Sequence, residues 1–227
     1  MILTLSETKP EAGDAASFIF EPGQALEWKA GQYLHYTLPH DNPDSRKDER
    51  YFTIASAPFE KRVMITTRIV EKASSFKRAL KALAIGGQIR ADGPFGEFTD
   101  DDPEAEFVFI SGGIGITPYR SILLDLDRRG LPIKGLLMYA NSTDNAVFRE
   151  ELESLAGRHP DFRIAYFIGD RRIDEAAVRA AVPDLGRPFF YASGPEPMVQ
   201  AMEKMLLGMG VPDGRFKRDF FPGYDWP

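Results

Sequence analysis

The chain of 227 residues contains no cysteine, and this absence removes several kinds of chemistry. Without thiols the chain can form neither disulfides nor zinc sites with thiolate ligands, and it can hold no cysteine-ligated iron–sulfur cluster. A thiol nucleophile is excluded as well. Any redox centre of this protein must therefore be an organic cofactor.

Histidine is also scarce, and basic residues are fewer than acidic ones. His35, His40 and His159 are scattered without the spacing that metal ligands share, so we assign no metal site. The 28 lysines and arginines are outnumbered by 34 acids, and the net charge is −6. Because the chain offers no overall basic field to phosphate backbones or anionic lipid, we expect it to bind neither nucleic acid nor a membrane surface.

Two further absences concern the location of the protein. No apolar run is long enough to span a bilayer, and residues 1–10 contain neither a basic leader with an apolar stretch nor a cleavage site. We therefore predict a cytoplasmic protein without membrane insertion. With 43% hydrophobic and 27% charged residues the composition is that of a globular protein, and its length fits one large domain or two ordinary ones.

The first hundred residues contain short segments that are typical of strands. Clusters of glycine, proline and acidic residues separate them, as at Glu21-Pro22-Gly23. Such closely spaced strands indicate an antiparallel barrel or sandwich. One helix is predicted among them, because Ser74 and Ser75 offer an N-cap and the apolar residues from Phe76 to Leu83 recur at helical spacing. The predicted strands are 16–20, 32–38, 51–56, 63–70 and 88–92.

The pattern changes after an acidic linker without periodicity, residues 96–106. Strands predicted at 107–111, 135–140, 163–168, 189–192 and 216–220 now alternate with helices that begin near Pro118, Ala146, Asp174 and Pro197. Parallel strands need crossovers of this kind, so the second half is predicted to be a doubly wound parallel sheet that binds a nucleotide. We place the domains at 1–100 and 101–227.

Ligands of a doubly wound sheet bind beyond the carboxyl ends of the strands, where the winding direction reverses. With a strand order of 3-2-1-4-5, this point lies between the first and fourth strands. The loops that follow these strands are residues 112–118, GGIGITP, and residues 193–198, SGPEPM. The two loops are therefore predicted to face each other across one crevice.

The first of these loops combines glycine with a helix start. Gly112, Gly113 and Gly115 would let a pyrophosphate approach the backbone closely, while Thr117 and Pro118 suit the N-cap and first position of a helix whose dipole favours an anion. A glycine-rich turn before a helix is also a common structural device. This motif alone leaves both interpretations open.

Three ordered motifs together resemble those of the ferredoxin-NADP reductase family of two-domain flavoproteins. They are Arg50-Tyr51-Phe52-Thr53, GGIGITP at 112–118 and SGPEPM at 193–198. The similarity extends from about Gly31 to Tyr224. It implies an N-terminal antiparallel β-barrel that binds FAD and a doubly wound parallel-sheet domain that binds NAD(P), with the nicotinamide meeting the flavin between them.

The resemblance gives roles to the first motif. Arg50 matches the arginine that pairs with the flavin pyrophosphate, Phe52 the aromatic that stacks on the isoalloxazine, and Thr53 the hydroxyl residue near flavin N5. Taken without the family, Arg50 is a solvated loop charge, Phe52 a core aromatic and Thr53 an outward strand residue. Phe52 also lacks the hydroxyl of the tyrosine that often stands there.

The chain departs from the family pattern at Ala73 and at Ser193. Ser74 and Ser75 match the start of its phosphate-binding helix, but Ala73 replaces the usual preceding glycine, so a plain N-cap is the alternative. Ser193 stands where a cysteine is common, close to the hydride path, and serine lacks the soft sulfur. The resemblance assigns catalytic roles to Thr53, Ser193 and Tyr224, and cofactor contacts to Arg50, Phe52, Thr53, Arg68, Ser74, Ser75, Gly112, Gly113, Gly115, Thr117, Pro118, Gly194, Pro195, Met198, Phe221 and Tyr224.

The last eight residues contain four aromatics, which is unusual for a chain end. Members of the family often keep a C-terminal aromatic over the flavin, so we predict Phe221, Tyr224 or Trp226 on the flavin face opposite Phe52. The alternative is that Phe220 and Phe221 finish the last strand and the remainder covers a sheet edge.

The resemblance implies a FAD-dependent oxidoreductase that takes a hydride from NAD(P)H and passes electrons onward. A chain without cysteine cannot carry the iron–sulfur domain of fused reductases, so the acceptor is external: a ferredoxin, a flavodoxin, an oxygenase component, free flavin or a ferric chelate. Reverse flow from reduced ferredoxin to NAD(P)⁺ is a rival within the family. The other alternative is a redox-inactive nucleotide-binding or regulatory module, against which the intact Arg50-Phe52-Thr53 set argues.

NADH is predicted to be preferred over NADPH. NADPH-specific relatives usually place basic residues after the second strand of the parallel sheet, where this chain has residues 141–145 with the acid Asp144. An acid repels a 2′-phosphate but can accept a ribose hydroxyl. Arg171 and Arg172, after the third strand, favour the opposite preference.

Overall fold

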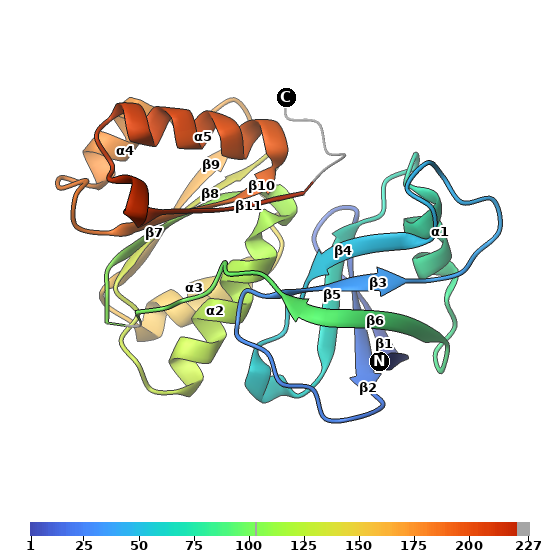
Figure 1. Cartoon of the computed structure of the whole chain (residues 1–227). Coiled ribbons are helices and arrows are strands. Elements are labelled where there is room, and N and C mark those ends of the chain that lie inside the picture. The colour runs from blue at the N-terminus through green and yellow to red at the C-terminus, as the bar shows by residue number, and fades with distance from the viewer. Residues whose placement is uncertain (103, 222–227) are drawn as a thin grey trace.

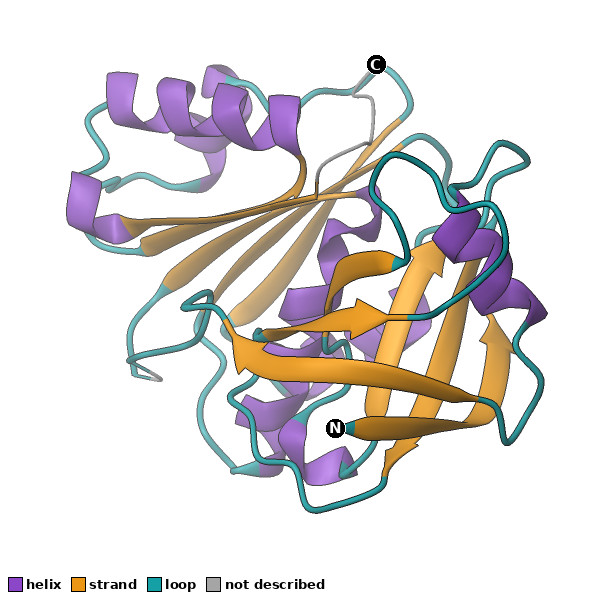
Figure 2. Cartoon of the chain, turned by 45° about the vertical axis from the view of Figure 1, so that its right-hand side comes forward, coloured by secondary structure: helices purple, strands orange, loops and turns teal. Residues whose placement is uncertain are grey.

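The computed structural model describes residues 1–102 and 104–221, and two sheets lie side by side in it (Figure 1). The first is antiparallel, has the strand order β4-β3-β6-β1-β2-β5, and curls into an open barrel (Figure 2). Its strands are β1 (Ile2–Pro10), β2 (Ala15–Pro22), β3 (Tyr33–Thr37), β4 (Glu49–Thr53), β5 (Val63–Arg68) and β6 (Gln88–Phe95). The antiparallel barrel predicted for this half is confirmed.

Strand β1 was missed by the sequence patterns. It lies in the interior of the sheet, between β2 and β6. Only Leu3 and Leu5 are buried along it, and its second half is polar and exposed. A strand with so short an apolar signal does not show the alternation by which half-buried strands are recognised.

A short helix, α1 (Ser75–Ala82), covers one end of the barrel. The hydroxyl of Ser74 accepts a hydrogen bond from the backbone N–H of Lys77 at 3.4 Å, so Ser74 is the predicted N-cap. Phe76 and Leu80 are buried in the barrel core, as the helical spacing predicted.

The second sheet is parallel throughout and has the order β11-β10-β7-β8-β9. Numbered in chain order, this is the 3-2-1-4-5 arrangement that was taken for a doubly wound sheet, and β7 lies beside β10 at the reversal point. Helices α2 and α3 cover one face, and α4 and α5 cover the other (Figure 1). The elements are β7 (Phe107–Gly112), α2 (Thr117–Arg128), β8 (Gly135–Asn141), α3 (Arg149–Arg158), β9 (Phe162–Ile168), α4 (Glu175–Ala181), β10 (Phe189–Pro195), α5 (Glu196–Gly208) and β11 (Phe216–Phe221).

Two predicted helix starts are corrected. The helix expected near Ala146 begins at Arg149, because Phe148 before it has a left-handed backbone with φ of 62°. Thr117 is not an N-cap, since a 3-10 turn over Gly113–Ile116 already winds the chain into α2. The Thr117 hydroxyl instead donates a hydrogen bond to the carbonyl of Ile114 at 3.2 Å.

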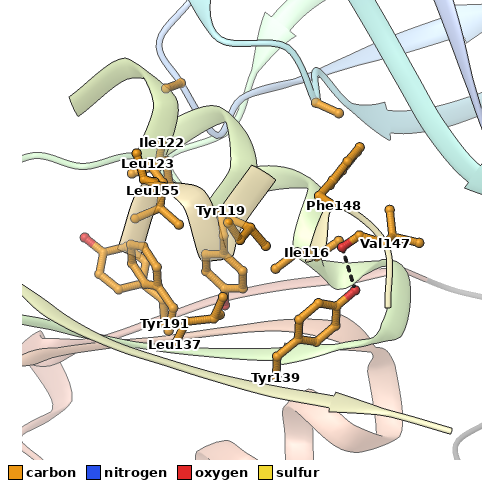
Figure 3. Packing of buried hydrophobic residues seen from close by; sticks show 14 of the residues in the cluster. Ile116, Tyr119, Ile122, Leu123, Leu137, Tyr139, Val147, Phe148, Leu155 and Tyr191 are labelled. Carbon is orange, nitrogen blue, oxygen red and sulfur yellow. Dashed lines mark hydrogen bonds between the residues drawn. The ribbon is translucent and has the colours of Figure 1, made fainter. Parts of the chain in front are cut away.

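The two halves share part of one hydrophobic core. Barrel residues Ala30, Ala55 and Phe98 belong to the same buried cluster as Ile116 and Tyr119 of the second half. Figure 3 shows part of this cluster, in which the Tyr139 hydroxyl donates to the carbonyl of Val147. The barrel therefore packs on the α2 face of the parallel sheet, although the exact division at residue 100 remains a prediction.

Two absences hold for the described ranges 1–102 and 104–221. None of the helices there combines the length and apolar character that crossing a membrane requires. Within the same ranges, no three histidine or acidic side chains gather as metal ligands would.

Candidate functional site

The two loops at the reversal point touch, as the topology predicted. A Cβ atom on Gly115 would lie 2.1 Å from the carbonyl oxygen of Ser193, and one on Gly112 would lie 2.4 Å from the sulfur of Met198. Contact between the loops therefore requires both glycines, which is a different reason from the predicted approach of a pyrophosphate. Gly113 has φ of 53° and open space where a side chain would stand.

A cavity of about 540 Å³ lies over these loops. The predicted contact residues Gly112, Gly113, Pro195 and Met198 line it. Among the other residues predicted in the loops, Gly115, Pro118 and Gly194 are buried and are not in its lining. The cavity occupies the position in which a doubly wound sheet binds a dinucleotide.

A second cavity, of about 590 Å³, opens beside the barrel. Arg50, Phe52, Thr53 and Ser74 line it from the barrel, and Thr117 lines it from the other half. Ile114 and Arg68 line both cavities. The two sites predicted from separate motifs are therefore adjacent, and the start of α2 stands between them.

The barrel cavity is basic although the protein as a whole is acidic. One acid, Glu49, is in its lining, together with the basic residues Arg46, Arg50, Arg68, Lys72 and Lys77. Of these, Arg68 forms a forked ion pair with Asp14, with Nε–Oδ1 and Nη2–Oδ2 distances of 2.7 and 2.9 Å. Such a lining favours a phosphate-bearing ligand.

Arg50 is buried, with 6% of its surface exposed. Most of its side-chain N–H groups donate hydrogen bonds to other residues of the chain. Its Nη2 donates to both carboxylate oxygens of Asp44 at 2.7 and 2.6 Å, and its Nη1 donates to three backbone carbonyls between Arg46 and Glu49. Its Nε is buried without a partner among the described residues. Arg50 is therefore no solvated loop charge, and one N–H remains for a ligand.

Asp44 ties Arg50 to the start of α1. Its carboxylate accepts the backbone N–H of Ser75 at 3.1 Å, and its own N–H donates to the Ser75 hydroxyl at 2.9 Å. Partial burial would raise the pKa of Asp44, but hydrogen bonds from Arg46, Arg50 and Ser75 hold that pKa well below its usual range. Ser75 is thus engaged by Asp44 and does not line the cavity, whereas Ser74 does.

The lining residues fit a flavin dinucleotide. Phe52 is half-buried and packs against Tyr36 and Phe76 with ring centroids 5.9 and 5.8 Å away, while still lining the cavity. The unpartnered Nε of Arg50 and the basic lining suit a pyrophosphate. An aromatic face and a cationic wall in one cavity are the features that an isoalloxazine and its diphosphate require.

Ser193 lies beneath the reversal point and is fully buried. It is in register with Ser111 of β7 and with Asp219 of β11, and its hydroxyl donates to the Asp219 carboxylate at 3.4 Å. Burial raises the pKa of Asp219 to about 6. Asp219 was not singled out from the sequence. The signal that could have found it is that it is the single carboxylate within the aromatic strand 216–221.

The cavity over the two loops, called the sheet cavity below, contains the residues that would decide between NADH and NADPH. Ser142, Arg171 and Arg172 line it. Asp144 instead pairs with Arg149 at 2.9 Å and is not in the lining. The acid on which the NADH prediction depended therefore does not line the cavity, whereas another acid, Asp170, lines it beside Arg171 and Arg172.

The predicted aromatic cover of the flavin is outside the described residues. Tyr224 and Trp226 are beyond residue 221, and of Phe221 only the backbone, paired with Pro195, is described. Their roles stay predictions.

Comparisons with known proteins agree with this arrangement. Residues 109–204 match the model of the oxidoreductase NAD-binding domain. The chain is 34% identical over 220 residues to ferredoxin–NADP reductase B of Sorangium cellulosum, covering 86% of either chain. It is 29% identical to the reductase component of phenol 2-monooxygenase from Pseudomonas sp. strain CF600, covering 86% of this chain and 57% of that one.

The fold is shared with solved structures as well. The FAD/NAD-binding domain of nitric oxide dioxygenase from Vibrio cholerae superimposes with a TM-score of 0.83 at 20% identity, covering 97% of this chain and 98% of that one. The predicted fold, an antiparallel barrel followed by a doubly wound parallel sheet, is thereby confirmed. The chain spans only 55 to 65% of the length of seven of the relatives it matches.

Proposed function

Since the chain belongs to the ferredoxin-NADP reductase family, we propose that it is a flavoprotein reductase that binds FAD in the barrel cavity and NAD(P)H in the sheet cavity. Electrons pass from the nicotinamide through the flavin to an external acceptor. The observation that carries this proposal is the meeting of the two cavities at Ile114 and Arg68. A redox-inactive module would not need its two nucleotide sites to adjoin.

The chemistry that FAD supplies when bound is the acceptance of a hydride and the release of electrons singly or in pairs. The residues of the chain bind and orient. Arg50 Nε and the basic lining would hold the phosphates, and Phe52 and Thr53 would contact the isoalloxazine ring. The loops that touch through Gly115 and Ser193, and through Gly112 and Met198, would hold the nicotinamide nucleotide in the sheet cavity. Holding the reacting atoms roughly 3 to 3.5 Å apart supplies most of the rate gain, so no acid or base from the chain is obligatory.

The acceptor is proposed to be a separate protein that carries its own redox centre. Among the relatives, one is named a ferredoxin–NADP reductase and another the reductase component of an oxygenase. We propose a ferredoxin, a flavodoxin or an oxygenase component in this role, and a cytoplasmic location. Anaerobic reduction of a panel of such acceptors by the protein and NAD(P)H tests the choice.

For the nucleotide, the preference for NADH is retained as the hypothesis to be tested. Asp144 does not support it, because this acid pairs with Arg149 outside the cavity, and the lining residues Arg171 and Arg172 favour NADPH. Steady-state specificity constants for both nucleotides decide the matter. A higher constant for NADPH would overturn the NADH preference.

The decisive test of the function is flavin content. The purified protein should be yellow, release FAD on denaturation, and bleach on anaerobic addition of NAD(P)H. Replacing Arg50 with alanine removes charge-assisted contacts to the pyrophosphate, so FAD should bind more weakly by about 1.5 to 3 kcal/mol. Arg90→Ala, on the exposed side of β6, is the matched control and should leave the affinity unchanged. A colourless protein that binds no added FAD would refute the proposal.

The tail provides a separate test. We propose that Phe221, Tyr224 or Trp226 covers the flavin face opposite Phe52 and moves aside for the nicotinamide. Deleting residues 224–227 should then alter the flavin spectrum, the reaction with oxygen and the Michaelis constant for the nucleotide. If all three stay the same, residues 224–227 are structural cover and Phe221 is the remaining candidate.

A further inference from the structure

Arg120, on helix α2, is the most extensively bonded side chain between the two halves of the described structure. Only 7% of its surface is exposed. Its Nη1 donates to the carbonyl of Ala55 and to Glu60, both at 2.9 Å, and Ala55 and Glu60 belong to the barrel half. Its Nε and Nη2 donate to Glu151 of α3 at 2.6 and 3.0 Å. The guanidinium therefore joins three segments that are distant in sequence.

The barrel segment that Arg120 holds is itself braced. Glu60 accepts the backbone N–H of Ala57 at 2.6 Å, which closes the turn after β4. The hydroxyl of Ser121, next to Arg120, donates to the carbonyl of Ser56 at 2.8 Å. Two adjacent residues of α2 thus hold two adjacent carbonyls of the barrel, and these contacts oppose sliding of one half along the other.

The contact of Arg120 with Ala55, Glu60 and Glu151, called the clamp below, lies close in sequence to residues that line the cavities. Ala55 follows Thr53 of the barrel cavity by two residues. Arg120 follows Thr117, at the end of the glycine loop, by three residues, which is about one helical turn. Thr53 and Thr117 both line the barrel cavity, and Ile114, in the same glycine loop as Thr117, lines both cavities. A displacement of this contact would therefore move segments that line both cavities.

The charges at the clamp are matched to its burial. Burial alone would lower the pKa of Arg120, but hydrogen bonds and charges of Glu60 and Glu151 outweigh it and raise that pKa. The ring of Phe148 lies 5.2 Å from the guanidinium carbon and closes one side. A flexible lysine could replace the charge but not the five donors of the planar fork.

We propose that Arg120 is a positioning residue, which fixes the barrel against α2 and thereby sets the approach of the nicotinamide to the flavin. This inference rests on the proposed function. Each cavity is lined mainly by one half of the molecule, whereas transfer between the two cofactors depends on the relative placement of the halves. The clamp is therefore expected to govern the step between NAD(P)H and flavin and to leave the later oxidation of the flavin by a small acceptor unaffected.

The test separates these two half-reactions in Arg120→Lys. Stopped-flow reduction of the bound flavin by saturating NAD(P)H should slow about tenfold or more, since displacements near 1 Å cost up to about a hundredfold. Reoxidation of photoreduced flavin by ferricyanide should stay within about twofold of the parent rate, as expected when the barrel site is intact. Arg129→Lys, which alters an exposed ion pair with Asp125 on the same helix, is the control and should change neither rate.

A second readout needs no cofactor. Calorimetry of the flavin-free protein should show a lower unfolding temperature for Arg120→Lys than for the parent, because the variant loses the forked contact to Ala55 and Glu60 while the Ser121–Ser56 hydrogen bond and the shared hydrophobic core remain. If that variant does not fold, Glu60→Gln and Ser121→Ala each weaken the same contact and take its place. Unchanged hydride transfer, or equal slowing of both half-reactions, would overturn the positioning role. A flavin-free parent protein would refute the proposed function instead, and the calorimetry would still test the clamp.

Discussion

Asp219 predicts an unusual pH dependence of stability. Its pKa rises through burial from 3.8 to about 6, a difference of about two pKa units. Because one unit corresponds to about 1.4 kcal/mol, ionising this carboxyl makes the folded state less stable by up to about 3 kcal/mol. The raised pKa means that the folded state keeps the proton longer than the unfolded state does, so this contribution to stability is present below pH 4 and lost as the pH rises to 6.

Asp219→Asn keeps the shape and an oxygen that can accept from Ser193, but it cannot ionise. The variant should therefore unfold at higher urea concentration than the parent at pH 8, and its advantage should be about 2 kcal/mol larger at pH 8 than at pH 4. Urea denaturation of the flavin-free protein at both pH values measures this difference. Asp213→Asn, an exposed change in the turn before the same strand, should shift stability by less than about 0.5 kcal/mol at either pH. An equal effect of Asp219→Asn at the two pH values would refute the reasoning.

Two further predictions concern the loops that form the cavities. Asp44→Ala leaves the buried Arg50 guanidinium without its carboxylate, so the free energy of unfolding should fall by about 2 kcal/mol in urea titrations, and an unchanged value would mean that the pair contributes nothing. Gly115→Ala places a methyl group 2.1 Å from the Ser193 carbonyl and should cost about 3 kcal/mol or more. Gly157→Ala, in open space on α3, should stabilise by up to about 1 kcal/mol, and thermal melts that rank the two variants the other way would contradict the loop contact.

Much of the fold was readable from local patterns. The alternation of apolar runs with helical segments from Phe107 onward predicted a doubly wound parallel sheet, and the strand order taken for such a sheet placed the two loops together at the reversal point, where they touch. Strand β1 escaped because only Leu3 and Leu5 are buried along it. Its place inside the barrel depends on pairing with β2 and β6, and β6 is more than 80 residues away.

For the site, the sequence alone determined the residue types and the two loops, because glycines before a helix and an arginine–aromatic–hydroxyl strand are local signals. It could not determine which polar groups pair. Asp44 takes the Nη2 of Arg50, Glu60 and Glu151 take Arg120, and Asp144 turns to Arg149. Each pairing depends on how loops and helices dock in three dimensions, since a buried charge takes whichever opposite charge the packing brings within reach. Only the tertiary structure therefore decided which of the predicted charges face a ligand and which hold the two halves together.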